Sequence, residues 1–450
     1  MKQQPMARKL LALALSLLLV LAFTPTVFAE GEVAQVGAQK YATVQLAIDA
    51  IQSGTVTGTI EMIDDSTENV TIPAGITVTL DLAGYTLTNK DGQHTITNNG
   101  TLIILDSKGG GIVDNTIDAK AALMNQGTAT LKSGTLTRSV EKGNTASDKH
   151  GNSYYVVENT DNATLNIEGG TVIAEGNYSS LLRNRGTLNV SNGKLENGYN
   201  AIKNETGTVN ISGGTIQATV PGETAFLNDA YATISGGEIL SDGGSALVSR
   251  TTTNAGSTTI QGTAKITGNV NVLFLTPPDE YHEGDFQAIL NVNGGTIDGN
   301  ISAENYSDVN ITGGSVTGTL STKPGTNLQL PTELTVTGGA FDKQPADEYI
   351  GTSLMAQVDN DGKYYVGAAA SSAIASAKKT VSVLNGNSVT NVPAGVTVTN
   401  STGANISVNG SNLSAGSSTS IKGPFTEPTY YPDYDEDVDY LPPVEDEPEQ

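Results

Sequence analysis

The sequence predicts an all-β solenoid, a parallel β-helix, and three observations lead to this prediction. The first is an internal repeat, because the phrase Val209-Asn-Ile-Ser-Gly-Gly-Thr-Ile216 recurs with small changes along most of the chain. The second is the alternation of apolar and polar residues before each Gly-Gly pair, which is typical of strands with one buried face. The third is the spacing, since seven of the ten intervals between copies are 19 to 26 residues long. That length accommodates three short strands and their turns.

The second apolar residue of each copy marks the predicted core. These markers are Leu82, Ile104, Leu131, Ile167, Val190, Ile211, Ile234, Ile260, Val292, Ile311 and Val336. Gly-Gly after a marker predicts a sharp corner, where φ is positive or side chains would crowd. In nine of the eleven copies the residue five positions beyond the marker is apolar again. The corner therefore leads back to an inward-facing residue.

Six copies also carry an asparagine six to eight residues before the marker. These residues are Asn98, Asn125, Asn159, Asn184, Asn204 and Asn228. An amide has both donors and an acceptor, so stacked asparagines can hydrogen-bond from coil to coil. We expect them to form a buried column at one corner of the solenoid.

The first 29 residues are predicted to be a secretory signal peptide. Three basic residues precede the apolar run Leu10–Phe23, and Val27-Phe-Ala29 places small residues at the cleavage position. The apolar run is short for a membrane span, although a retained anchor is the alternative. We therefore expect a secreted or cell-surface protein that does not insert into the membrane after the signal is removed.

Residues 30–368 are predicted to form the β-helix, with one helix before the repeats. Tyr41, Val44, Ala47, Ile48 and Ile51 follow the spacing of one apolar helix face. Gly54 is placed to end a helix at 39–51. The first coil of a solenoid has unpaired backbone groups, so this helix is expected to cap it.

The pattern changes after the repeats. Residues 369–421 are predicted to contain a short helix at 368–377 and a closing set of strands that reaches about Ser420. Residues 422–450 combine ten acidic residues with several prolines and have no basic residue beyond Lys422. This composition predicts a disordered, extended acidic tail.

The composition limits the partners. The chain has no cysteine, which excludes disulfides, thiolate catalysis and cysteine-ligated metals. Its formal net charge of -24 disfavours nucleic acid and anionic lipid. Polyanionic substrates such as pectate are disfavoured too, unless a basic patch or bound Ca²⁺ intervenes.

The segment Tyr41–Ala50, followed by an Ile-Pro-Ala-Gly turn and Leu80–Leu87, resembles the entry to pectin-lyase-like proteins exported by Gram-positive bacteria. Val336–Tyr349 and Val358–Val366 are similar to a module common at the end of such surface repeats. The resemblance covers about residues 38–368 and implies a right-handed single-stranded parallel β-helix. That superfamily holds lyases, hydrolases, carbohydrate-binding modules and adhesins alike.

Catalytic signals are sparse. Asn159-Thr-Asp161 resembles one element of the pectin hydrolases of this fold, but the other elements are missing, and it also fits the asparagine column. Asp359-Asn-Asp-Gly362 lacks the later ligands of a calcium loop and is better explained as a β-turn. We therefore predict no catalytic residue, no metal site and no cofactor. Paired carboxylates brought together by folding remain the alternative.

Two insertions interrupt the repeats and are the predicted ligand-binding loops. Glu141–Tyr155 lies between the second and third strands of one coil, and Thr276–Gln287 occupies a corner where other coils carry asparagine. The candidate binding residues are Tyr154, Tyr155, Asp279, Glu280, Tyr281 and His282. Tyrosine can stack on sugar rings, although such tyrosines also fix loops to a scaffold.

The sequence thus predicts a non-catalytic, adhesin-like or carbohydrate-binding protein. Its expected partner is a neutral glycan or a host or cell-surface protein. A polysaccharide lyase or glycoside hydrolase is the alternative function.

Overall fold

A computed structural model describes residues 31–117, 120–139, 155–174, 180–197, 200–251, 256–275, 287–323, 331–351, 354–358, 362–367, 380–383, 388–389, 392 and 397–421. The predicted signal peptide, the acidic tail and the short helix at 368–377 lie outside the described residues.

The chain divides into two compact units. The first comprises Met1–Thr352 and Val358–Val366, and the second comprises Ser353–Gln357 and Gly367–Gln450.

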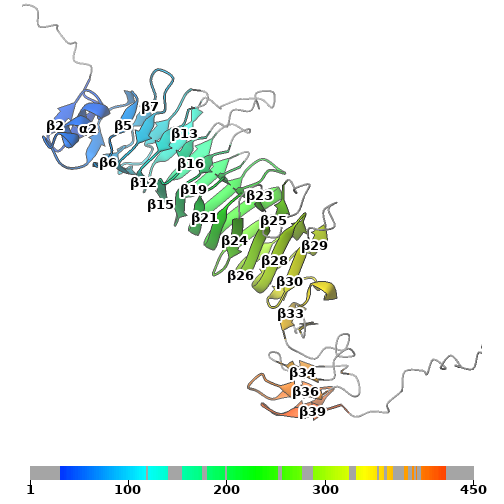
Figure 1. Ribbon diagram of the computed structural model, residues 1–450. Coiled ribbons are helices and arrows are strands. Elements are labelled where there is room, and N and C mark those ends of the chain that lie inside the picture. The colour runs from blue at the N-terminus through cyan, green and yellow to red at the C-terminus, as the bar shows by residue number, and fades with distance from the viewer. Residues whose placement is uncertain are drawn as a thin grey trace, which may run out of the picture. The chain divides into compact units, whose positions relative to one another are not determined.

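The first unit is a stack of three-stranded coils, as expected for an all-β solenoid (Figure 1). In one coil β12 (Thr128–Leu131), β13 (Thr135–Arg138) and β14 (Val157–Asn159) follow one another. Each strand pairs in parallel with its equivalent one coil further along the chain, as β12 does with β15 (Thr164–Ile167). We call the three positions the first, second and third strands of a coil.

The other strands take the same three positions. First strands are β3 (Ile60–Met62), β6 (Thr77–Asp81), β9 (Thr101–Leu105), β18 (Thr187–Val190), β24 (Gly256–Ile260) and β30 (Glu333–Val336). Second strands are β4 (Ser66–Thr67), β7 (Thr86–Thr88), β10 (Ile112–Asp114), β16 (Thr171–Ala174), β19 (Lys194–Asn197) and β31 (Ala340–Phe341). Third strands are β5 (Val70–Ile72), β8 (Ile96–Asn98), β11 (Leu123–Asn125), β17 (Leu182–Asn184), β20 (Ile202–Asn204), β22 (Phe226–Asn228), β27 (Ile301–Glu304) and β29 (Leu320–Lys323).

Five long strands run continuously through one or two corners. They are β21 (Thr208–Ala218), β23 (Tyr231–Thr251), β25 (Lys265–Phe274), β26 (Ala288–Asp298) and β28 (Ser307–Val316). The ladder between β21 and β23 is interrupted only at the corner, on either side of Ser212. The corner is therefore a bend within paired strands.

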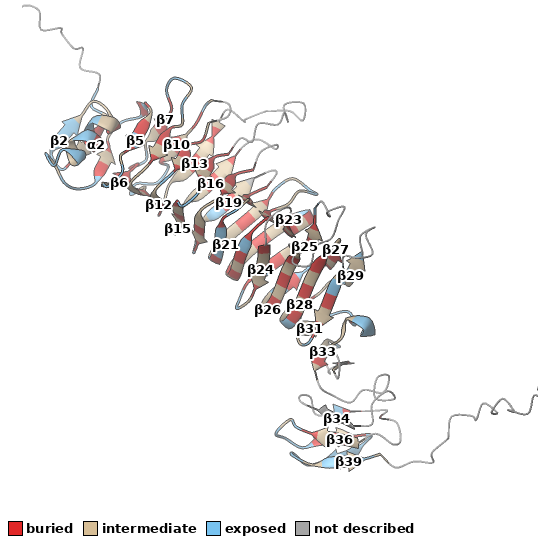
Figure 2. Ribbon diagram, in the orientation of Figure 1, coloured by how far each residue is buried: buried red, intermediate tan, exposed pale blue. Residues whose placement is uncertain are grey.

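Inward-facing apolar residues fill the interior of the stack, and Figure 2 shows buried residues alternating with others along the strands. Ten of the eleven markers align in register as predicted, but the first marker was wrong. Leu80, not Leu82, pairs with Ile104. Leu82 is buried as well, just beyond the end of the first strand. Val78, Leu80 and Leu82 alternate with polar residues, so the sequence allowed either Leu80 or Leu82 as the marker. The strand pairing shows that the marker is Leu80.

The Gly-Gly pair is required at the corner for two reasons. Gly214 has φ +80, which is unfavourable for residues with a side chain. A Cβ at Gly213 would lie 2.1 Å from the carbonyl oxygen of Ser191 in the coil below. Stacked backbones therefore leave no room for a side chain at this corner.

The predicted asparagine column is confirmed as a continuous hydrogen-bonded ladder of buried side chains. Each amide Nδ2 donates to Oδ1 of the next asparagine along the chain. The donor–acceptor distances for Asn98–Asn125, Asn125–Asn159, Asn159–Asn184, Asn184–Asn204 and Asn204–Asn228 are 2.7, 2.8, 2.7, 2.8 and 2.7 Å. The ladder ends where Asn228 donates to Thr258 Oγ1, which in turn donates to Ser249 Oγ.

The N-terminal end departs from the prediction of a helix at 39–51. Gln39–Tyr41 forms β2, which pairs antiparallel with β1 (Ala34–Val36), and β1 pairs antiparallel with β3. The helix α2 (Val44–Gln52) begins after Thr43, whose side chain accepts a hydrogen bond from the Leu46 N–H. This N-cap fixes the start of the helix, so Tyr41 belongs to a strand.

Helix α2 bonds directly to the first coil. Val44 and Gln45 donate their N–H groups to the carboxylate of the buried Glu68, at 2.7 and 3.0 Å. Gln45 Oε1 accepts from the Thr71 N–H at 2.7 Å, on the edge strand β5. The side chain of Gln45 thus bonds to the backbone of an edge strand.

The C-terminal end of the first unit contains η3 (Asp347–Tyr349) and most of β33 (Tyr364–Gly367), which is antiparallel to β31. Most of β32 (Met355–Val358) belongs to the second unit. In the second unit the predicted late strands form two sheets of their own. One contains β34 (Thr380–Val383), β36 (Thr397–Asn400) and β39 (Ser418–Ser420). The other contains β35 (Ser388–Val389), β37 (Ile406–Val408) and β38 (Ser411–Leu413).

Candidate functional site

The first strands present two outward-facing columns of side chains. Alternation along each strand buries one residue and leaves the next toward solvent. In three successive coils the outward residues are Thr164 and Asn166, Thr187 and Asn189, and Thr208 and Asn210, all in register. We call these six residues the polar strip. It has no charged and no aliphatic side chain.

The asparagines of the polar strip form a second ladder, on the outside of the coil. Asn210 Nδ2 donates to Asn189 Oδ1 at 2.9 Å, and Asn189 Nδ2 donates to Asn166 Oδ1 at 2.9 Å. Asn166 Nδ2 then donates to Thr130 Oγ1 at 3.3 Å. The donors point toward the N-terminal coils, opposite to the buried ladder. The strip is therefore an ordered array of amides and hydroxyls.

An exposed aromatic residue follows the strip on the next coil. Tyr231 pairs in register with Thr208 on β21 and with Ser257 on β24. Its side chain is 49% exposed, one of three large apolar residues exposed in the described part of the chain. The same column carries threonine in the six preceding coils, from Thr77 to Thr208. Tyr231 thus departs from the threonine repeat, and packing of the core does not require this change.

A group of ion pairs lies at the adjacent corner, between the third strand and the first. Arg183 Nη2 and Lys203 Nζ bind the two oxygens of Glu205 at 2.7 and 2.8 Å. The guanidinium of Arg183 also lies over the ring of Tyr155, 5.4 Å from its centroid. One carboxylate thus holds two cations from neighbouring third strands.

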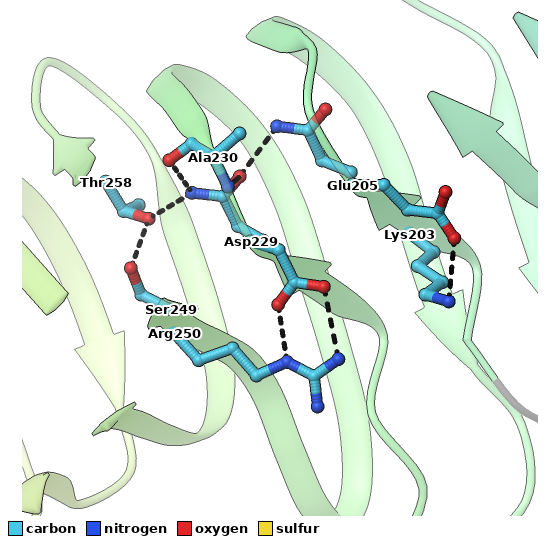
Figure 3. Close-up of polar contacts among 9 residues, drawn as sticks. Lys203, Glu205, Asp229, Ala230, Ser249, Arg250 and Thr258 are labelled. Atoms are coloured by element: carbon cyan, nitrogen blue, oxygen red, sulfur yellow. Dashed lines mark hydrogen bonds and ion pairs between the residues drawn. The ribbon is translucent and has the colours of Figure 1, made fainter. Parts of the chain in front are cut away.

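A second ion pair joins Arg250 to Asp229, which closely precedes Tyr231 in the chain. Figure 3 shows Asp229 and Arg250 facing each other, with both carboxylate oxygens bonded to the guanidinium. The Nη2–Oδ2 distance is 3.1 Å, and the side chains are 21% and 11% exposed for Arg250 and Asp229. A bidentate pair that is largely buried is held firmly, so Asp229 and Arg250 form a rigid polar pair.

The electrostatics keep this group ionised at neutral pH. Burial raises the pKa of Glu205, but hydrogen bonds from Lys203 and Arg183 and their charges outweigh burial and lower it. Burial lowers the pKa of Lys203, but its hydrogen bond to Glu205 and the surrounding negative groups outweigh burial and raise it. These residues therefore act as fixed charges and do not exchange protons near pH 7.

The structure describes only one of the six predicted binding residues. Tyr155 is 3% exposed, so its ring is buried beside Arg183 and faces no solvent. Tyr154, Asp279, Glu280, Tyr281 and His282 lie outside the described residues. Their role as ligand-binding residues stays a prediction.

The corners that bear the two insertions are as predicted. The first insertion connects β13 with β14, a second strand with a third strand. The second connects β25 with β26, at the corner that carries asparagine in other coils. The two insertions therefore leave the stack at different corners.

The Asn159-Thr-Asp161 sequence is explained by structure alone. Asn159 belongs to the buried ladder, and Thr160 Oγ1 donates to the carbonyl oxygen of Asn125 at 3.1 Å. Asp161 lies 3.8 Å from Arg185 Nε. Each of the three residues thus has a partner that belongs to the scaffold.

Sequence reasoning missed Tyr231 and the ion pairs, although one signal was present. The column of Thr-x-Asn pairs is visible in the repeats, and an aromatic residue at Tyr231 breaks it. Glu205 gave no signal, because its partner Arg183 comes from another coil. Pairing across coils depends on a register that the chain spacing alone does not fix.

No group of three or more His, Asp or Glu side chains is placed to hold a metal ion in the described ranges. Within the same ranges, no helix is both long and apolar enough to cross a membrane.

Comparison of the chain with models of known protein families, with curated proteins and with solved structures found no match. The pectin-lyase-like resemblance therefore stays a prediction.

Proposed function

We propose that this protein is a non-catalytic, exported binding protein that recognises a neutral glycan through the polar strip and Tyr231. The observation that carries the proposal is the exposed ring of Tyr231 beside an ordered, uncharged array of amides and hydroxyls. Tyrosine stacks on the apolar face of a sugar, while amides and hydroxyls bond to its hydroxyl groups.

The chemistry of the strip supports a sugar over other partners. Protein interfaces depend on aromatic, aliphatic and arginine residues that become buried at the centre. The six strip residues include none of these. The strands of the strip are paired on both sides, so an extended peptide has no free edge to join there. The net charge of -24 opposes nucleic acid.

Binding is favoured over catalysis by the state of the charged groups. An enzyme that cleaves polysaccharides by acid–base chemistry needs a group whose pKa lies near the working pH. Glu205 and Lys203 have their pKa values moved away from neutrality in opposite directions. They support a fixed polar surface better than proton transfer.

The proposal includes two finer features of the fold. The coils wind in a right-handed sense, as almost all parallel crossover connections do. Helix α2 caps the first coil through its bonds to Glu68 and Thr71. Export to the outside of the cell rests on the sequence of the first 29 residues.

The test is a binding screen on a panel of neutral and acidic polysaccharides, scored for both binding and cleavage. We expect at least one neutral glycan to bind without being cleaved, and Tyr231→Ala to weaken binding more than tenfold. The matched control is Leu46→Ala on α2, an apolar residue with the same exposure of 49%. Binding that survives Tyr231→Ala, or cleavage of any bound glycan, would contradict the proposal.

A further inference from the structure

The polar strip repeats the same chemistry on successive coils. Parallel strands lie about 4.8 Å apart, so each rung of the strip follows the last at that interval. From Asn166 to Tyr231 the surface covers four coils. Three such intervals span about 14 Å along the stack. A ligand that itself repeats at a similar interval can make equivalent contacts on every coil.

The asparagine amides of the polar strip have the same arrangement on successive coils, so the repetition extends to individual hydrogen-bonding atoms. Asn189 and Asn210 each use one N–H group in the outer ladder. Within the described residues, these are the hydrogen bonds that the two amide nitrogens donate. Each side chain therefore keeps a second N–H for a ligand, and successive coils offer the same donor.

The direction of the ligand follows from what lies on either side of the strip. A ligand chain that ran parallel to one strand would meet two outward-facing residues and then, at one end, the Gly213 corner. At the other end it would meet the Glu205 and Asp229 ion pairs. A ligand chain that ran across the strands would meet only the uncharged residues of the polar strip and then the ring of Tyr231. The second direction gives a neutral polymer many more hydrogen bonds.

We propose that the ligand is an unbranched neutral polysaccharide whose chain runs along the stack of coils, with one sugar ring stacked on Tyr231. This proposal rests on the glycan binding proposed above and adds the shape and direction of the ligand. Single hydrogen bonds contribute little each, so binding depends on the number of rungs that are occupied together.

The experiment is a titration of the exported chain with linear neutral oligosaccharides of one to six units, taken from a glycan that binds in the panel. We expect affinity to rise about two- to tenfold with each added unit and to level off near four units. Equal affinity for the disaccharide and the hexasaccharide would overturn the polymer proposal while leaving glycan binding intact. Absence of binding at every length would instead remove the proposed function, and this inference with it.

A matched pair of variants tests the direction. Asn189→Asp keeps the shape of the side chain but removes its N–H donors, two coils away from Tyr231. We expect this variant to bind the tetrasaccharide about tenfold more weakly and to bind the disaccharide with unchanged affinity, since a disaccharide on Tyr231 does not reach Asn189. The control is Asn291→Asp, in the same column but beyond the strip, with no effect on either ligand. Equal losses for both ligands in Asn189→Asp, with thermal stability unchanged, would refute the direction.

Discussion

Asparagine serves two different purposes at the scale of single residues, and burial separates them. Asn204 lies in the buried ladder, where its Oδ1 accepts from Asn184 and its Nδ2 donates to Asn228 and to the carbonyl oxygen of Gly207. Asn210, on the first strand of the next coil, is exposed on the outer ladder. The buried amide has no water to replace a lost partner, whereas the exposed amide does.

This difference gives a stability prediction with an internal control. We expect Asn204→Leu to lower the free energy of unfolding by about 1–3 kcal/mol, because Asn184 and Asn228 lose partners in the core. Asn210→Leu should change it by no more than about 0.5 kcal/mol. Thermal and urea unfolding of the two variants would measure both effects. Equal losses would mean that the buried ladder does not stabilise the coil.

His94 is expected to make stability depend on pH. Its Nδ1 accepts a hydrogen bond from the Ala121 N–H at 2.9 Å. Burial, followed by the positive charges of Lys120 and Arg138, lowers the pKa of His94 below 6.5. The unfolded chain then binds the proton more readily than the folded one, so protonation favours unfolding. Stability is full above the unfolded pKa and is lost as the pH falls through the folded value.

The matching variant is His94→Asn, because Oδ1 can accept the same hydrogen bond without titrating. Between about pH 7.5 and pH 5, we expect the Tm of the wild type to fall more than that of the variant. The measurement is Tm against pH by calorimetry at constant ionic strength. Parallel curves for the two proteins would show that His94 does not contribute.

At the scale of elements, the coils were predictable because their cause is local and periodic. Alternation placed Ile211 inward and Gly213-Gly214 at a corner, and both follow from residues within one repeat. The start of α2 was less predictable, since Tyr41 fits either a helix face or a strand. Its state is decided by the pairing of β2 with β1, and by the Thr43 cap. The candidate site depends on contacts between residues of different coils, and the sequence of a single repeat does not predict such contacts.

Helix α2 provides the prediction at this scale. Replacing Glu68 with alanine removes the acceptor for the first N–H groups of the helix, which a nearby carboxylate stabilises by about 1–2 kcal/mol. We expect amide exchange to become about tenfold faster in α2 and at Thr71, and to stay unchanged from β9 onward. Glu32→Ala, at an exposed ion pair with Lys40, is the control.

The same variant tests whether α2 protects an edge. A released helix would bare the backbone of β5, so Glu68→Ala should associate as its concentration rises. Size-exclusion chromatography over a range of concentrations would detect this. A monomeric variant with faster exchange only in α2 would show that the helix is not a cap.

For the whole molecule, charge separates the proposed ligand from its competitors. The chain has a formal net charge of -24, yet the polar strip is uncharged. Binding of a neutral glycan should release no counterions, so its affinity should be the same at about 50 and 200 mM salt. A polyanion or a cationic partner would bind with strong salt dependence. A titration at both salt concentrations distinguishes them, and more than a threefold change would contradict a neutral ligand.

The most direct test of the account is a crystal structure of the protein with a neutral tetrasaccharide. We expect one sugar ring on Tyr231 and the remaining units over Asn210 and Asn189, along the stack of coils. Sugar bound at the insertions, Glu141–Tyr155 or Thr276–Gln287, with the polar strip left in solvent, would contradict it.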